Sequence, residues 1–389
     1  MGDDWHYLDH AATTPLRPEA LAAMMPALHG GRGNPSGAHA LARRARADLD
    51  GAREDLAGVV GCEPGEIVFT SGGTEADNLA VRGVLSARPG TAICTAIEHH
   101  AVLRPVEAAG GRIVPVDRRG VVDLEAMATA LDENVSLVSI GLVNNELGTI
   151  QPLTEIAAVV REQAPNALLH TDAAQALCWL DLRHHAAAAD LVTLVAHKCG
   201  GPVGTGALVV RAGVTLQAQQ LGGGQERERR SGTQDVAGAL GFAAAAIAAA
   251  HEREALVDRA TTWRDELAAA ITRAVPGAVE SAAGDDGDRR HLVAGIANLC
   301  LPAVDSEALL FMLEHDHRVL ASAASSCASG AQEPSHVLAA LGLPRALAAG
   351  SLRLSLGWST TQADIDAAAV GVPDAVRRLQ THVRDGAPA

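Results

Sequence analysis

The chain has 389 residues, of which 48% are hydrophobic, so it is long enough to bury a large core and to form two domains. A formal net charge of -15 and an aromatic content of only 2% argue against nucleic acid as a direct partner. The acidic start carries no secretory signal, and the six scattered cysteines form no CxxC pair. We therefore expect a cytoplasmic protein without a disulfide framework or a permanent metal site.

From about residue 66 to residue 211, short β-branched runs alternate with helix-like stretches. This alternation predicts a mostly parallel α/β sheet with both faces covered. The strand candidates are 67–70, 92–95, 112–116, 136–143, 167–171, 191–195 and 207–210. Ligands of such sheets bind beyond the carboxyl ends of the strands, so the residues that follow each strand are the candidates for a site.

The pattern changes after about residue 250. The apolar run 237–250 is too short for a membrane span and predicts a buried helix. A helical stretch at 253–275 and a Gly/Asp-rich link lead to a second α/β segment from about residue 292. We expect a large domain at 15–252 and a small domain formed by 1–14 together with 253–389.

Lys198 lies three residues after the end of the apolar strand candidate 191–195, with His197 before it and two glycines shortly after it. Burial lowers the pKa of a lysine, and the neutral amine can attack carbonyl groups and form Schiff bases. A lysine that is simply solvated at a strand end is the alternative.

Other strand ends carry groups that could surround a cofactor. Gly73 and Thr74 begin a helix whose free N–H groups could hold a phosphate, or the segment is an ordinary capped helix. His99 or the adjacent His100 could stack on a flat ring and transfer protons, or both are loop histidines. Asp172 is costly to bury unless a positive group such as a protonated ring nitrogen pairs with it, although it could also cap a helix.

Three further features favour an amino acid substrate or a mobile nucleophile. The pair Asn144 and Asn145 could form a turn or bind a ligand oxygen. Arg353, inside an apolar alternating run, suits either a substrate α-carboxylate or a structural ion pair. Cys327 lies among Ser, Ala and Gly residues, which offer little to bury it, so we expect an exposed thiol that is nucleophilic as the thiolate.

Taken together, these motifs resemble the NifS/IscS-like cysteine desulfurases of the class V aminotransferase family, which use pyridoxal 5'-phosphate. The resemblance runs from YLDHAATTP at 7–15 to the segment 353–357 and so covers nearly the whole chain. Its other motifs include GNPS at 33–36, NNELG at 144–148, HK at 197–198, RSGT at 230–233 and EPS at 333–335.

The resemblance implies the type I fold of pyridoxal-phosphate enzymes, with a seven-stranded, mostly parallel sheet in the large domain and a smaller α/β C-terminal domain. It also implies a homodimer with shared active sites. The resemblance implies that Lys198 holds the cofactor covalently, that Asp172 pairs with its ring nitrogen and that Gln175 bonds its phenolic oxygen. His99 would stack on the ring and transfer protons, and Asn145 and Arg353 would lie at the substrate carboxylate. The residues implied at the phosphate are Gly73, Thr74, His197 and Thr233 of the other subunit.

The implied reaction converts L-cysteine to L-alanine and leaves the sulfur as a persulfide on Cys327. The sulfur would pass to an iron–sulfur scaffold, a tRNA-thiolation protein or a cofactor-thiolation protein, and Cys327 could also be a transient iron–sulfur ligand. A selenocysteine lyase, another class V enzyme, or a non-catalytic protein on the same fold are the alternatives.

The chain departs from the family pattern at two places. Val195 and Ala196 precede His197, where the family often has a serine two residues before that histidine, and Leu221 replaces a histidine before the glycine triplet. Both departures predict weaker binding of the cofactor.

Overall fold

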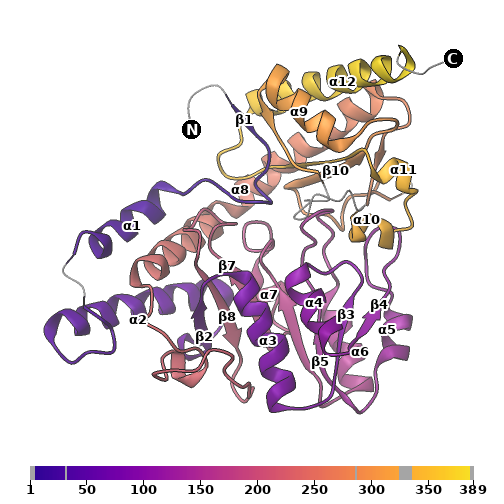
Figure 1. Cartoon of the computed structure of the whole chain (residues 1–389). Helices are drawn as coiled ribbons and strands as arrows, with labels where there is room; N and C mark the ends of the chain where they lie inside the picture. Colours follow the sequence, from indigo (N-terminus) through magenta and orange to yellow (C-terminus); the bar gives the residue numbers. More distant parts are fainter. Residues whose placement is uncertain (1–4, 31–32, 285–286, 324–334, 386–389) are drawn as a thin grey trace.

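The computed structural model describes residues 5–30, 33–284, 287–323 and 335–385 (Figure 1). Its largest element is a seven-stranded sheet with the order β2-β8-β7-β6-β5-β3-β4. The strands are β2 (Ile67–Thr70), β3 (Thr91–Thr95), β4 (Arg112–Val114), β5 (Val135–Ser139), β6 (Leu168–Asp172), β7 (Leu191–Val195) and β8 (Gly206–Val210). All neighbours are parallel except β8, which runs antiparallel to β2 and β7. The predicted mostly parallel sheet is therefore confirmed.

Strand β5 is shorter than expected. The apolar run 136–143 was expected to be one strand, but β5 ends at Ser139. The remaining residues turn, and Val143 forms an isolated bridge with Ile150. Buried apolar sequence alone does not mark this end, because the turn residues are buried as deeply as the strand.

Helices cover both faces of the large sheet. Because successive strand residues point to opposite faces, Leu137 and Leu191 pack in the core on one side, and Val138 and Val192 in the core on the other. The helices around the sheet are α1 (Pro18–Leu28), α2 (Ala40–Val60), α3 (Gly73–Ala87), α4 (His100–Ala108), α5 (Leu124–Ala130), α6 (Leu153–Gln163) and α7 (Leu182–His185). Residues of α3 and α4 line the first core, and residues of α2 and α6 line the second.

A separate core, the C-terminal core, lies in the C-terminal part of the chain. It is built on the antiparallel sheet β12-β10-β9, with the strands β9 (Val279–Glu280), β10 (Ile296–Cys300) and β12 (Ser351–Ser355). The helices here are α9 (Ser306–His317), α10 (His336–Ala340), α11 (Arg345–Ala348) and α12 (Gln362–Asp385). Strand β1 (His6–Tyr7) pairs in parallel with β11 (Val319–Leu320), and Leu8 is buried in this core. The N-terminal segment thus packs with the C-terminal part (Figure 1).

One helix connects the core under the large sheet with the C-terminal core. The two expected helical stretches, 237–250 and 253–275, form the single helix α8 (Val236–Ala274). Ala239 and Ala249 pack under the large sheet, while Leu256 and Ile271 pack in the C-terminal core. The expected division at 252/253 therefore falls inside a continuous helix. Among the described residues, no helix has the length and apolarity needed to cross a membrane.

Candidate active site

The carboxyl-end edge of the large sheet gathers the predicted residues. Strand β6 ends at Asp172, and β7 ends three residues before Lys198. The two strands are parallel neighbours, with Asp172 opposite Thr193. Helix α3 begins directly after β2, close to the end of β7. Parallel pairing therefore brings Asp172, Lys198 and the start of α3 to one place, as expected.

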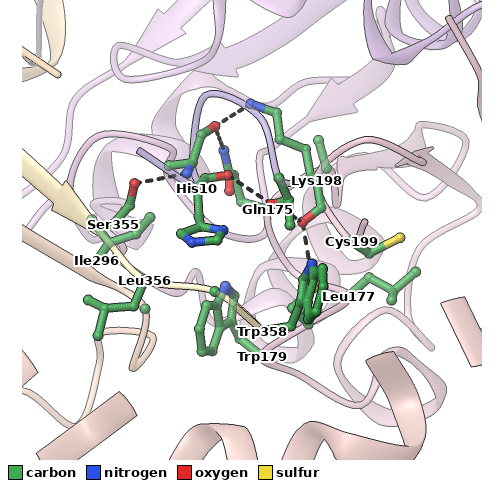
Figure 2. A pocket seen from close by; sticks show the side chains of 16 residues that line it. His10, Gln175, Leu177, Trp179, Lys198, Cys199, Ile296, Ser355, Leu356 and Trp358 are labelled. Atoms are coloured by element: carbon green, nitrogen blue, oxygen red, sulfur yellow. Dashed lines mark hydrogen bonds between the residues drawn. The ribbon is translucent and has the colours of Figure 1, made fainter. Parts of the chain in front are cut away.

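Lys198 lies half-buried between this edge and the N-terminal segment. Its Nζ donates a hydrogen bond to the carbonyl of Ala11, which also accepts from Gln175 Nε2 at 2.8 Å (Figure 2). Burial and the Arg353 guanidinium lower the pKa of Lys198 to about 8, although the Asp172 carboxylate opposes this shift. About a tenth of the amine is therefore neutral at pH 7, far more than for an ordinary lysine, and the neutral form is the one that attacks carbonyl groups.

Among the described residues, no cationic side chain is in hydrogen-bond contact with Asp172. Its Oδ1 accepts the backbone N–H of Ala174 at 2.9 Å, and burial raises the pKa of the carboxyl group. The residues that follow form turns rather than a helix, so Asp172 is not a helix N-cap. A protonated ring nitrogen would supply the positive partner that this carboxylate lacks.

The N-terminus of α3 has N–H groups that no side chain caps. The N-cap residue is Gly72, which has φ 146° and no side chain to bond the first N–H groups. Thr74 is exposed in the first turn, and Glu75 in the same turn is held by Arg230 at 2.7 Å. Helix N–H groups without a capping side chain suit a phosphate.

Val195 lies beside the first residue of α3. A Cβ atom placed on Gly73 would be 2.8 Å from Val195 Cγ2. The departure from the family pattern at this position thus puts a methyl group where a hydroxyl could face the phosphate.

The adjacent histidines His99 and His100 point to different neighbours. His99 caps α4, with Nδ1 accepting the N–H of Ala101 at 3.1 Å. Its side chain is exposed to the site, yet protein packed against the ring lowers its pKa, while the Asp172 carboxylate raises it. His100 instead stacks on His336, with ring centroids 4.7 Å apart. Both Asp172 and Lys198 influence the pKa of His99, which places it at the site.

His197 points toward the N-terminal segment. Its Nδ1 lies 3.1 Å from the hydroxyl of Thr13. Burial, reinforced by Lys198, lowers the pKa of His197 to about 4, so the ring is neutral at physiological pH. A neutral ring can still donate one hydrogen bond to a phosphate.

Arg353 is buried and already paired. Its Nη2 contacts Asp9 Oδ1 at 2.9 Å, and its Nη1 donates to the carbonyl of Asn145 at 2.9 Å. Its Nε is buried without a hydrogen-bond partner among the described residues. The structural ion pair that was one interpretation of Arg353 is therefore present, and it leaves three of the five guanidinium N–H donors without a partner among the described residues.

The two asparagines differ in their contacts. Asn144 forms the turn, because its Oδ1 accepts the N–H groups of Glu146 and Leu147, both at 2.9 Å. The Asn145 side chain has no hydrogen-bond partner within the described ranges. It is free to bind a ligand oxygen.

Sequence reasoning gave no role to Asp9 or to the Ala11 carbonyl. Asp9 is 344 residues from its partner Arg353, so no local pattern could pair them. A carbonyl oxygen has no sequence signature at all. The DHAA motif was the only available signal.

Two predicted residues are not brought into the site by the described chain. Thr233 is exposed, and a contact with the other subunit cannot form within one chain. Cys327 lies outside the described residues. The residues that flank it, however, contact the site: Ser322 bonds the backbone of Arg353, and the Ser335 hydroxyl bonds the Glu146 carboxylate.

Comparison with known proteins shows the family of the chain. The family model of the aminotransferase class-V family matches residues 6–368, so the chain belongs to this family. An "IscS-like cysteine desulfurase" of Mycobacterium tuberculosis is 41% identical over 388 residues, which cover 96% of this chain and 97% of the relative.

Two solved structures are also similar. A "NIFS-LIKE PROTEIN" has a TM-score of 0.87 and 31% identity, with 96% of this chain and 99% of that chain covered. "SspA in complex with cysteine" has a TM-score of 0.77 and 32% identity, with 90% and 98% covered. The fold is that of the type I pyridoxal-phosphate enzymes, and the cofactor is pyridoxal 5'-phosphate. The uncompensated Asp172, the uncapped start of α3 and the low-pKa Lys198 fit this group.

Proposed function

We propose that the site removes sulfur from L-cysteine with Lys198, His99 and Cys327 as its catalytic residues. The enzyme is a pyridoxal-phosphate-dependent cysteine desulfurase, and its products are L-alanine and sulfur held as a persulfide. The observation that carries the proposal is the low-pKa amine of Lys198 at the sheet edge that also presents Asp172.

The described residues would hold the cofactor from several sides. Lys198 would bind it covalently, Asp172 would pair with the ring nitrogen and Gln175 would donate to the phenolic oxygen. Its phosphate would lie on Gly73, Thr74 and His197, joined by Thr233 of the second subunit. When bound, pyridoxal phosphate withdraws electrons from the substrate α-carbon.

The substrate carboxylate would bind between Arg353 and Asn145. Arg353 is held in place by Asp9 and by the Asn145 carbonyl, so its remaining N–H donors and the Asn145 amide are pre-positioned. A structural relative, SspA, has been solved with cysteine, which supports an α-amino acid as the substrate. His99, which is exposed and whose pKa the Asp172 carboxylate raises, would stack on the ring and move protons.

Sulfur transfer requires a nucleophile from the chain. The Cys327 thiolate would attack the substrate sulfur, so that a sulfur–sulfur bond forms while the carbon–sulfur bond breaks. The β-carbon of the substrate then gains a proton from Lys198, and the product leaves as alanine. The contacts of Ser322 and Ser335 support this role, because they tether both flanks of the Cys327 segment beside the site.

The chemistry is tested with two variants and a control. We expect Lys198→Ala to lose the covalently bound cofactor band. We expect Cys327→Ser to keep that band but to stop alanine release from cysteine in the presence of a thiol acceptor. Cys62→Ser, at a half-buried cysteine in the loop after α2, should behave like the wild type. Undiminished alanine release from Cys327→Ser would contradict the proposal.

The persulfide would be delivered to an iron–sulfur scaffold or to a tRNA-thiolation protein in the cytoplasm. We also propose the two-domain division, with residues 1–14 joining 253–389, because Leu8 shares the C-terminal core. A homodimer is supported by exposed apolar residues on α1, namely Leu21, Met25 and Leu28.

A further inference from the structure

A group of polar side chains is buried inside the sheet core next to Asp172. Its members are Ser139 on β5, His170 on β6, Thr193 on β7 and Asp77 on α3. Ser139, His170 and Thr193 are 0% exposed, and Asp77 is 1% exposed. Such residues are rarely buried without a purpose, because each must be hydrogen-bonded to offset its desolvation. We call these four residues the buried polar cluster.

Hydrogen bonds connect the residues of the buried polar cluster one after another. His170 Nδ1 lies 2.7 Å from Ser139 Oγ, and His170 Nε2 lies 3.0 Å from Thr193 Oγ1. The Thr193 hydroxyl also hydrogen bonds the Asp77 carboxyl group. Asp77 Oδ1 has no hydrogen-bond partner among the described residues and lies 3.7 Å from His170 Nε2, which is too far for a hydrogen bond.

The buried polar cluster is connected directly to Asp172. His170 and Asp172 are two residues apart on β6, so their side chains lie on the same face of the sheet. Thr193 is the register partner of Asp172 on β7, and the Thr193 carbonyl accepts the N–H of Ala173 at 3.0 Å. Any shift of Thr193 would therefore move the strand end that presents Asp172.

The charges around Asp77 are mainly acidic. The groups that face it are Asp172 and Glu98, together with His170. Within the described part of the chain, His170 is the only basic side chain within 4.0 Å of Asp77. Burial lowers the pKa of His170 to about 3, so this ring is neutral. Burial and the Asp172 charge both raise the pKa of Asp77.

An ionised Asp77 would be unfavourable on geometric grounds as well. It would leave a buried carboxylate with one oxygen unpartnered and with a second carboxylate nearby. A neutral carboxyl group with one unpartnered oxygen costs much less than a charged one. Asp172, in contrast, gains a cation when the cofactor binds, so the single negative charge is best placed there.

We propose that Asp77 is a neutral carboxyl group and that Asp77, Thr193 and His170 are positioning residues, which fix Asp172 and leave the negative charge of the site to it. This inference rests on the proposed pairing of Asp172 with the cofactor ring nitrogen. It assigns a role to buried groups that do not touch the cofactor or the substrate themselves.

Two threonine variants test the positioning role. Thr193→Val removes the hydroxyl that joins His170 to Asp77. Thr171→Val is the matched control, because Thr171 is equally buried on β6, faces the other side of the sheet and donates to Ile140 O at 2.7 Å. Both should lose similar thermal stability.

Only Thr193→Val should weaken pyridoxal-phosphate binding to the apoenzyme, by about five- to tenfold, and shift the pH midpoint of the cofactor absorbance band by about half a unit or more. Equal effects of both variants on binding and on this midpoint would overturn the positioning role.

A third variant tests the charge of Asp77. Asp77→Asn keeps the size and the hydrogen-bonding capacity of the side chain but cannot be charged. If Asp77 is neutral, the pH midpoint of the cofactor band should stay within about 0.3 units of the wild type. If Asp77 is ionised, the loss of a negative charge should lower the midpoint by about one unit, and the proposal is then wrong.

These outcomes are separate from those of the proposed function. A wild-type protein that binds no pyridoxal phosphate, or an Asp172→Asn variant that titrates like the wild type, would refute the cofactor pairing itself. A normal wild type with a shifted Asp77→Asn midpoint would refute only the neutral Asp77.

Discussion

At the scale of single residues, Lys198 shows how burial prepares a nucleophile. Its amine is taken from water, lies near the Arg353 guanidinium and is only partly compensated by Asp172. These influences bring its pKa from 10.5 to about 8. The backbone carbonyl of Ala11 orients the amine without neutralising it.

We expect this pKa to control cofactor attachment. The rate at which pyridoxal phosphate binds covalently to the apoenzyme should rise with pH and level off above about 8, because only the neutral amine attacks. Stopped-flow absorbance at several pH values measures it. A midpoint near that of an exposed lysine would contradict the burial effect.

The same shift affects stability. Between pH 8 and the unfolded-state value near 10.5, the unfolded apoenzyme binds more protons at Lys198 than the folded one. The free energy of unfolding should therefore rise with pH across this window, by linkage. We expect Lys198→Met, which is neutral in both states, to lack this increase in urea titrations.

Val195 is the residue at which the chain departs from its family in the anion site. We expect Val195→Ser to tighten pyridoxal-phosphate binding by about three- to tenfold, because a hydroxyl beside Gly73 adds a donor for the phosphate. Equilibrium dialysis of the apoenzyme measures the affinity. Ala196→Ser is the control, since Ala196 packs in the large core, and it should bring no gain.

At the scale of elements, the segment that precedes α8 is held by a buried ion pair. Arg53 on α2 forms two hydrogen bonds of 2.9 Å with Glu226, which also accepts the N–H of Phe69 at 2.9 Å. Residues Glu226, Arg227 and Glu228 all have positive φ, a conformation that costs energy in non-glycine residues. The ion pair thus fixes the strained turn that leads to Thr233.

We expect Glu226→Gln to lower the free energy of unfolding by about 3–5 kcal/mol, because it leaves the Arg53 charge buried without its partner. Urea denaturation of the apoenzyme measures the change. Glu228→Gln, at an exposed position of the same turn, should change stability little. A similar loss in both variants would show that the turn, and not the ion pair, is stabilising.

At the scale of the whole molecule, α8 joins the two cores and α1 leaves an apolar face uncovered. Leu21, Met25 and Leu28 are 47%, 37% and 60% exposed, and their spacing places them on one side of the helix. Both α1 and α2 pack against α8, away from the C-terminal core (Figure 1). A second copy of the chain would cover this face.

We expect Leu21→Glu combined with Leu28→Glu to convert a dimer into a monomer with weaker cofactor binding, because Thr233 could no longer reach the second site. Analytical ultracentrifugation measures the oligomeric state. Val370→Glu, at a residue that is 69% exposed on α12, should leave the dimer intact. A wild-type monomer would contradict the shared site.

The sequence by itself determined which segments form the strands of the large sheet, although not every strand end. Runs such as 191–195 are apolar throughout because both faces of a parallel sheet are buried, and this signal is local. Residues that follow parallel strands lie at one edge of the sheet, so this pattern made Asp172, His197 and Lys198 candidates for a site, and the family resemblance joined them into one. The motifs also fixed the family, because their order and content are jointly specific.

Only the tertiary structure decided which distant groups meet. Arg353 pairs with Asp9 across 344 residues, and Lys198 reaches the carbonyl of Ala11 across 187. It also decided that α8 continues through its charged middle, because each half packs on a different core. Such contacts depend on chain packing in three dimensions, and neither periodicity nor motif spacing encodes them.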